Sequence, residues 1–395
     1  MSAKQAPRVN SPETAATVPD AIHRKFGTKA TGVEHFFAIT APGHLDLNEQ
    51  VKHVEMTYIK SLRALGIGPQ TAICRRIFLS DSLNQTDMVQ RCPLARESKD
   101  NPVAISIIQQ PPLPYAKIAL FAYHIESPGP LEKQRLSSQH MFVRHDGLKH
   151  LYSTRICLQN ADLSFSPAAQ TRSVFAGLAA VLSSQKGNLH DHCVRTWIYV
   201  KDIDIFYQGM VSERRDFFAQ NGLTQDTHFI ASSGIQGACA HRHDLISLDA
   251  YSIIGLRPGQ ITYLNDFKML CPTQNYNVTF ERGTRIASGD RSHYFISGTA
   301  SIDSQGNVLY PGDVAKQLDR TLANIEALLN SGQATLDDMM YLIVYLRDAA
   351  DYALVKDRLS QRLGTVPTVI VQAPVCRPEW LIEIEGVAVN SKGCL

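Results

Sequence analysis

Hydrophobic residues recur with a helical period between Val314 and about Asn330. Their separations of three or four residues place them in one stripe along a helix. The stripe consists of Val314, Leu318, Leu322, Ile325, Leu328 and Leu329. Gly332 follows where a C-terminal cap belongs. The pattern predicts an amphipathic helix packed on a core.

Short apolar runs typical of β-strands surround this helix. One run precedes it, and three follow it together with a second helix. The strands are expected over 293–303, 341–348, 368–373 and 380–389, and the second helix over 350–363. With one more strand expected before 293, the order of elements is β-β-α-β-α-β-β.

The same order recurs twice upstream, which indicates an internal repeat. In the middle copy we expect a helix around 174–182, a strand over 194–202, a helix near 206–220 and a strand over 244–254. In the first copy a helix over 51–65 leads to a strand over 75–81, and 106–123 completes the copy.

Individual positions of the three copies correspond. Phe78, Tyr199 and Tyr345 align, and so do Asp81, Asp202 and Asp348. By the same alignment Ala119 and Ser247 stand where the third copy has Glu383. The alternative is that short strands following amphipathic helices look alike in any protein.

The repeats predict an α+β protein of three tandem units, near 31–147, 148–257 and 258–395. A layer of helices on one sheet face leaves the other face to be covered, so the units are expected to form a pseudo-trimer within the chain. Such a chain needs no partner copy, so we expect a monomer or a weak oligomer. Residues 1–30, rich in Ala, Thr, Pro and Ser, are expected to be a disordered lead.

The composition of the chain disfavours several classes of function. The 395 residues are 44% hydrophobic, and 39 basic against 37 acidic residues give a net charge of +2. This balance disfavours nucleic-acid or membrane-surface binding. No apolar stretch approaches a membrane span, and the N-terminus does not resemble a signal peptide. We therefore expect a cytoplasmic protein.

The eight cysteines are dispersed without a CxxC pair and indicate reduced thiols, most of them buried. Two histidine groups could hold a metal: His190 and His192 around Asp191, and Cys239, His241 and His243 on what could be a strand. Neither group has an obvious partner group, so we expect no metal. No phosphate-binding glycine motif occurs, and we expect no cofactor.

The third unit resembles the RidA/YjgF family over its whole length. The motifs are FISGTASID, PGDVAKQL, NIEALL, VYLRD and WLIEIEGVAV. The resemblance implies a trimer-like α+β fold, also described as chorismate-mutase-like, with clefts between neighbouring units. It also implies an imine-binding arginine within 367–375, but this stretch has none. Glu383, the first carboxylate of IEIE, corresponds to the family's water-activating or proton-transferring glutamate.

A second resemblance, over about 150–390, is to the chorismatases, RidA-fold enzymes that release pyruvate from chorismate. It lies in PTQNYNVTFERGT, FISGTA, CRPEWLIEIEG and VRTWIYV. It implies Glu383 as the catalytic acid and Gly298 with Cys376 as the pair that selects 3-hydroxybenzoate over a dihydrodiol. The residues expected to bind the substrate lie in or next to the motifs of this resemblance. They are Tyr276, Phe280, Arg282, Gly298, Thr299 and Arg195. The first 140 residues and the short Asn-Val-Thr stretch after Tyr276 depart from the family.

The residues themselves leave alternatives open. Glu383 lies among apolar residues that would raise its pKa, although Glu383 or Glu385 could face solvent. Arg377 could favour a thiolate at Cys376, or Cys376 could be an inert buried thiol. Arg282 and Arg195 could bind a substrate carboxylate or form structural ion pairs. The protein is thus expected to be a chorismatase-like enzyme. The alternatives are a non-catalytic or metabolite-sensing RidA-like protein, or an imine or enamine deaminase.

Overall fold

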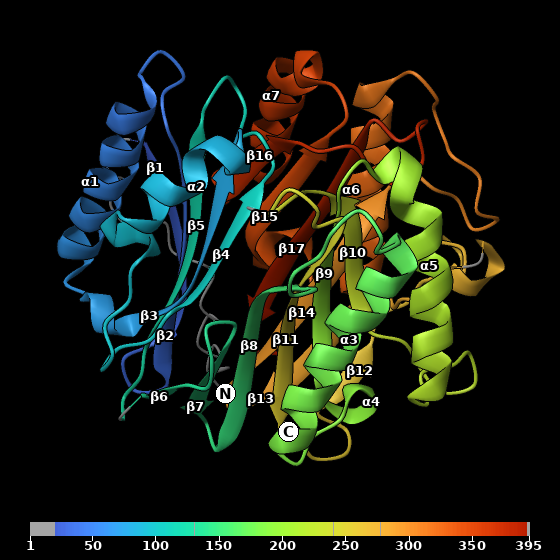
Figure 1. The fold of residues 1–395 in the computed structure, drawn as a ribbon, viewed down its shortest axis with the longest axis horizontal. Coiled ribbons are helices and arrows are strands. Elements are labelled where there is room, and N and C mark those ends of the chain that lie inside the picture. The colour runs from blue at the N-terminus through green and yellow to red at the C-terminus, as the bar shows by residue number, and fades with distance from the viewer. Residues whose placement is uncertain (1–19, 130, 240, 277, 393–395) are drawn as a thin grey trace, which may run out of the picture.

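The chain folds into three sheets, one from each third of the sequence (Figure 1). This computed structural model describes residues 20–392 apart from 130, 240 and 277. The first unit has the predicted order β-β-α-β-α-β-β, and the other two contain the same order with one more strand before it and, in the second, one more short helix. The predicted α+β fold with tandem units is therefore confirmed.

The first unit has five strands in the order β1-β2-β5-β3-β4. Its helix α1 begins with a capping box in which Asp46 accepts from the backbone of Glu49, and Glu49 accepts from the backbone of Asp46. The elements are β1 Ala21–Thr28, β2 Gly32–Thr40, α1 Leu47–Leu65, β3 Ala72–Leu79, α2 Ser82–Gln90, β4 Ala104–Gln109 and β5 Ile118–Glu126.

The second unit has six strands in the order β10-β9-β11-β8-β7-β6. Its helices α3 and α5 pack on each other, and α3 covers β8 and β11. The elements are β6 Glu132–Arg135, β7 His140–His145, β8 Leu148–Cys157, α3 Pro167–Ser184, α4 Leu189–His192, β9 Cys193–Val200, α5 Ile203–Gln220, β10 Ala231–Gln236 and β11 Ile246–Ile254.

The third unit has the order β12-β13-β14-β17-β15-β16. The predicted stripe lies on α6, whose apolar residues are buried against β14 and β17. The elements are β12 Ile261–Tyr263, β13 Gly283–Ser288, β14 Arg291–Ala300, α6 Val314–Ser331, β15 Met339–Leu346, α7 Tyr352–Leu363, β16 Thr368–Gln372 and β17 Ile382–Asn390.

The predicted correspondences between units hold at the level of strand pairing. Phe78 pairs with Ala119, Tyr199 with Ser247, and Tyr345 with Glu383. Each pair joins the strand after the first helix to the last strand of its unit. The units are therefore structural repeats.

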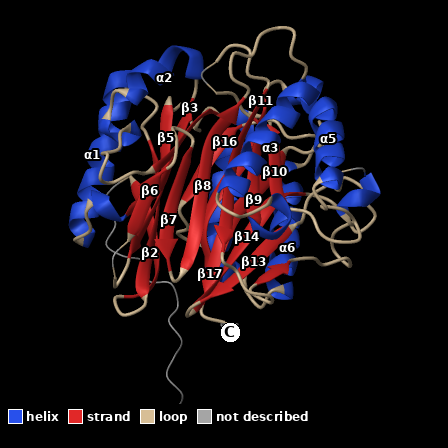
Figure 2. Ribbon diagram, turned by 60° about the horizontal axis from the view of Figure 1, so that its bottom comes forward, coloured by secondary structure: helices blue, strands red, loops and turns tan. Residues whose placement is uncertain are grey.

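The edge strands close the three units into a ring. Strand β4 contacts β8 of the second unit, β10 contacts β14 of the third, and β16 contacts β2 of the first. Figure 2 shows the strands in the interior and the helices toward the outside. The chain therefore builds an internal pseudo-trimer with three interfaces between units.

Two predicted boundaries are wrong. Residues 21–28, placed in the disordered lead, form β1, while residues 1–19 lie outside the described residues. Residues 132–145, placed in the first unit, form β6 and β7 of the second sheet. The polar sequence of β6, EKQR, lacks a buried face and gave no strand signal.

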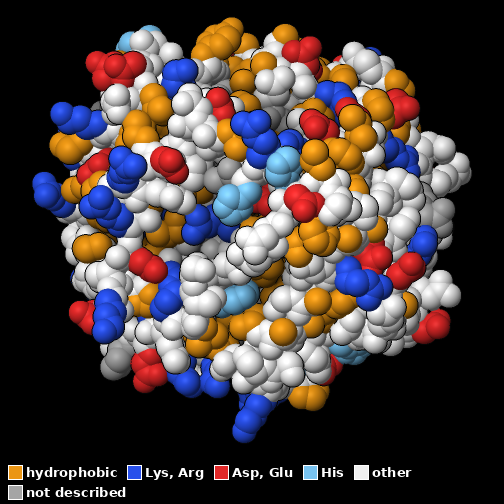
Figure 3. Space-filling model, viewed as in Figure 1, with side chains coloured by type: hydrophobic (Ala, Val, Ile, Leu, Met, Phe, Trp, Pro, Cys, Tyr) orange, Lys and Arg blue, Asp and Glu red, His pale blue; other side chains and the backbone are white. Residues whose placement is uncertain are grey.

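Positive and negative side chains are interspersed on the face shown in Figure 3, in keeping with the balanced charge. Within the described residues, no helix is long and apolar enough to cross a membrane. The seven cysteines of this part of the chain are free thiols, and Cys394 lies outside it.

Candidate active site

A cleft between the second and third units gathers most of the residues expected at the site. It encloses about 490 Å³ of space between side chains, part of it open to solvent. It lies where β10 of the second unit contacts β14 of the third. Its walls are Tyr207, Arg214, Ser232, Gly234, Phe280, Arg282, Gly298, Ala300, Ile302, Cys376, Trp380 and Glu383.

Glu383 is the acid of this cleft. It lies on β17, paired with Tyr345 on one side and Ala300 on the other, and is only 5% exposed. Burial and the nearby Glu385 raise its pKa to about 8, against a smaller opposite effect of Arg195 and Arg282. The predicted rise of the pKa is confirmed. Glu383 therefore holds a proton at neutral pH.

Gly298 faces Glu383 across the β14–β17 pair. A β-carbon at this position would overlap the Glu383 carboxylate and lie 3.1 Å from Oγ of Ser233. The Glu383 carboxylate therefore fills part of the space that a side chain at position 298 would take.

Arg282 brings positive charge to the same wall. It is 4% exposed, its Nη2 donates to the carbonyl of Cys271 at 2.8 Å, and its guanidinium lies 5.2 Å from the Phe280 ring centroid. The carbonyl and the ring hold the guanidinium in place. From this position the guanidinium also lowers the pKa of Glu383 slightly. Arg282 and Phe280 thus lie together in the wall of the cleft.

Cys376 lies in the cleft as a thiol and not as a thiolate. Burial and the charge of Glu383 raise its pKa to about 12, and the contribution of Arg377 is smaller. Desolvation outweighs the guanidinium, so the structure favours the buried thiol over the alternative of a thiolate stabilised by Arg377. Cys376 is a protonated neighbour of Glu383.

Arg195 and Glu385 form a buried ion pair beneath the cleft. Nη2 of Arg195 donates to Oε2 of Glu385 at 2.8 Å. Arg76 and the Nε1 of Trp197 also donate to Glu385, at 3.2 and 2.6 Å. The structural ion-pair interpretation of Arg195 therefore holds.

The alternative that one of the two glutamates faces solvent is wrong. Glu383 is 5% exposed and Glu385 1%. Residues two apart on a strand share a face, so both point into the interface between the units. Ser233 of β10 also donates to Glu385, and Arg195 donates to Oγ of Ser233 at 2.6 Å.

Two other expected binding residues do not line the described cleft. Thr299 is fully buried, and its hydroxyl donates to the carbonyl of Ser297 at 2.9 Å. The backbone of Tyr276 ends the short helix Thr273–Tyr276, but its side chain lies outside the described part of the structure. The site therefore keeps Glu383, Cys376, Arg282, Phe280 and Gly298 together.

Tyr207 and Arg214 also reach the cleft, from α5, and were not predicted from the sequence. Arg214 is only 2% exposed although it lies in the charged run SERRD. Two adjacent arginines give no sign of which one is buried. Only the helical spacing of seven residues between Tyr207 and Arg214, which puts them on one face, could have indicated them.

The histidine groups are arranged differently from the sequence interpretation. Cys239, His241 and His243 lie in the connection between β10 and β11 and not on a strand, and Sγ of Cys239 donates to Ser247. His241 instead meets Asp244 at 3.0 Å and lies near Cys157. His190 bonds its neighbour Asp191 at 2.7 Å.

Comparisons with known proteins agree with this fold. The family model described as endoribonuclease L-PSP matches residues 286–390. RutC family proteins of Pyrococcus abyssi and Pyrococcus horikoshii are each 32% identical over 96 residues, which are 24% of this chain and 76% of the relative.

A chorismatase crystal structure shares the fold of nearly the whole chain. It aligns with a TM-score of 0.63 and 17% identity, and covers 91% of this chain and 98% of its own. The first two units are thus part of the same architecture. The chain belongs to the RutC family of RidA/YjgF-like proteins.

Proposed function

We propose that this protein is a chorismatase-like enzyme that releases pyruvate from chorismate and forms 3-hydroxybenzoate. The observation that carries the proposal is Glu383, a buried carboxylic acid whose pKa of about 8 keeps it protonated in a cleft with Arg282. General acids work best when their pKa lies near the working pH. The chorismatase fold of the chain supports the same assignment.

The cleft suits a cyclic dicarboxylate. Arg282 and Arg214 provide two guanidinium groups, the side chain best suited to bidentate carboxylate recognition. Phe280 and Trp380 form apolar walls that can contact a ring. Chorismate has two carboxylates, a ring and an enol ether, so each of these features has a counterpart in the cleft.

Glu383 delivers the proton that starts the loss of the enolpyruvyl group. Negative charge on the departing side is offset by Arg282, which shares the cleft wall. Formation of 3-hydroxybenzoate and pyruvate consumes no net water, whereas a dihydrodiol and pyruvate require one water molecule. Cys376, a thiol beside Glu383, acts as the product-selecting group or as a second proton donor.

The three interfaces between units differ in the residue that stands at the position of Glu383. The positions equivalent to Glu383 are Ala119 and Ser247, so the other two interfaces lack this acid. We therefore propose one chorismate per chain, and a monomer or weak oligomer without a cofactor.

A coupled assay with lactate dehydrogenase tests the function. Pyruvate should appear when the protein meets chorismate, and chromatography should show 3-hydroxybenzoate in equal amount. Chorismate bound without pyruvate would favour a metabolite-sensing protein. Loss of semicarbazone from amino-acid-derived imines, without chorismate turnover, would favour a deaminase. Either result would overturn the proposal.

A further inference from the structure

A second cavity lies apart from the Glu383 cleft, between the inner faces of the three sheets. It encloses about 1100 Å³ of space between side chains, part of it open to solvent. None of the described residues that line the Glu383 cleft lines it as well. All three units contribute to it, for example through Phe121, Tyr251 and Phe295.

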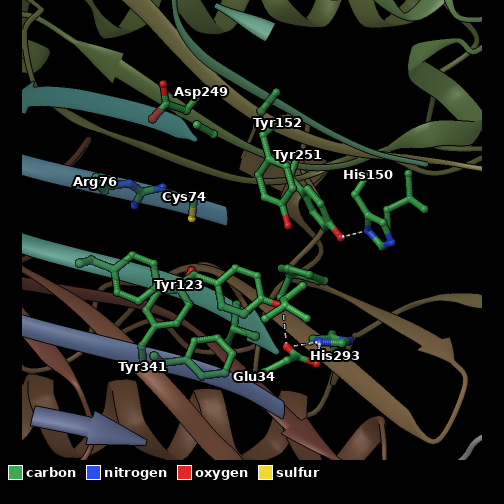
Figure 4. A pocket seen from close by; sticks show the side chains of 18 of the residues that line it. Glu34, Cys74, Arg76, Tyr123, His150, Tyr152, Asp249, Tyr251, His293 and Tyr341 are labelled. Atoms are coloured by element: carbon green, nitrogen blue, oxygen red, sulfur yellow. Dashed lines mark hydrogen bonds and ion pairs between the residues drawn. The ribbon is translucent and has the colours of Figure 1, made fainter. Parts of the chain in front are cut away.

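Aromatic rings dominate its walls. Phe121 and Tyr341 have centroids 4.2 Å apart, and Tyr152 and Tyr251 4.9 Å apart. In Figure 4, Tyr152 and Tyr251 lie on one side of the cavity and Tyr123 and Tyr341 on the opposite side. Walls of this kind contact a flat ring over both of its faces.

Two charged groups of the wall, Glu34 and Arg76, are paired within the protein. Glu34 accepts from Arg291 at 2.7 Å and from Tyr123 at 2.7 Å, and it meets His293 at 2.9 Å. Arg76 is paired with Glu385. An uncharged ligand therefore fits better than an ion, because it requires no new counter-charge in a buried site.

Two buried polar atoms of the wall have no hydrogen-bond partner among the described residues. They are Oγ of Ser106, whose residue is 3% exposed, and Nε2 of His150. Buried polar atoms nearly always form hydrogen bonds. Two atoms without a partner in one cavity therefore point to a ligand or water that bonds them.

The tautomer of His150 decides whether its Nε2 is a donor. Its Nδ1 meets the hydroxyl of Tyr251 at 2.6 Å, and burial lowers its pKa to about 4, so the ring is neutral. When the Tyr251 hydroxyl donates to Nδ1, the proton of the ring sits on Nε2. Nε2 then offers one hydrogen bond to an oxygen in the cavity.

We propose that this central cavity is a second binding site, for a small uncharged aromatic molecule with a hydroxyl group. The ring lies between the aromatic walls, and the hydroxyl oxygen accepts from Nε2 of His150 or bonds Ser106. This site is independent of the proposed chorismatase activity, because the residues argued for it do not line the Glu383 cleft.

The two tryptophans allow ligand binding at the two sites to be measured separately. Trp197 lines the central cavity and Trp380 lines the Glu383 cleft, and the sequence has no other tryptophan. In a Trp380→Phe variant, tryptophan emission reports on Trp197 alone. We expect para-fluorophenol to change this emission saturably, and fluorine NMR to give one bound molecule per chain.

Binding of para-fluorobenzoate and a variant of His150 test the class of ligand. The carboxylate should bind more weakly than the phenol. His150→Phe keeps a ring but removes the donor, and should weaken phenol binding about tenfold, the usual effect of losing a buried hydrogen bond. The matched control is His228→Phe, because His228 stacks on Tyr263 outside this cavity. This control should leave binding unchanged.

Two results would overturn the proposal. One is the absence of a saturable change, in emission and in NMR, up to the solubility limit of the phenol. The other is equal affinity in wild type and in His150→Phe, or in Ser106→Ala if the histidine variant fails to fold. Because these readouts need no turnover, they remain decisive if the protein does not act on chorismate.

Discussion

The missing side chain at Gly298 admits the carboxylate of Glu383. The two residues lie on neighbouring strands, β14 and β17, and a β-carbon at Gly298 would occupy the place of a Glu383 oxygen. The glycine therefore sets the position of the acid and does not simply widen the cleft.

Gly298→Ala should displace Glu383 and lower the rate of pyruvate release by about 10²-fold, the effect of misplacing a reacting group by about 1 Å. The measurement is kcat/KM for chorismate. Gly177→Ala is the matched control, since a β-carbon there meets only Ile156 at an ordinary 3.6 Å. It lies in helix α3 and should stabilise the fold by about 0.5–1 kcal/mol without changing the rate. Full activity of Gly298→Ala would contradict this account.

Protonation of Glu383 links activity and stability to pH. Its pKa rises from an ordinary value of 4.5 to about 8 in the folded protein. Between these values the folded state holds a proton that the unfolded state has released, so the free energy of unfolding falls as the pH rises. kcat/KM should also fall above about pH 8. In Glu383→Gln this stability slope should be smaller, as measured by urea unfolding, and an identical slope would argue against a raised pKa.

Cys376→Ala should leave pyruvate release measurable and shift the aromatic product toward a dihydrodiol. The reason is that the thiol stands beside Glu383 and carries its own proton at neutral pH. Chromatography of the products measures the shift. An unchanged product would remove the role assigned to Cys376.

Glu385 should matter for stability more than for binding. Replacing it with Leu leaves Arg195 and Arg76 buried without their shared counter-charge. The loss should be about 3–5 kcal/mol of unfolding free energy, typical of breaking a buried ion pair from one side. Urea unfolding measures it, and a loss below about 1 kcal/mol would show that the network is not structural.

Local patterns predicted much of this fold. The stripe on α6 is a continuous helical repeat, and the matching of Phe78, Tyr199 and Tyr345 appeared in strand pairing as expected. The boundary near 147 failed because β6 is a short polar edge strand, which leaves no alternating pattern in the sequence.

The site was only partly predictable for a related reason. Glu383, Cys376 and Arg282 were indicated by motifs and do meet in one cleft. The pairing of Arg195 with Glu385 joins residues 190 positions apart, on β9 and β17 of two units. Such contacts depend on how the units close into a ring, which no local pattern records.

The measurement that tests the central claim most directly is pyruvate release from chorismate by wild type and by Glu383→Gln. The glutamine keeps the shape of the side chain but has no acidic proton to transfer. We predict pyruvate formation by the wild type and a loss of about 10²- to 10⁴-fold in the variant, the usual contribution of a general acid. Equal rates in the two proteins, or no pyruvate from the wild type, would contradict the assignment of Glu383 as the catalytic acid.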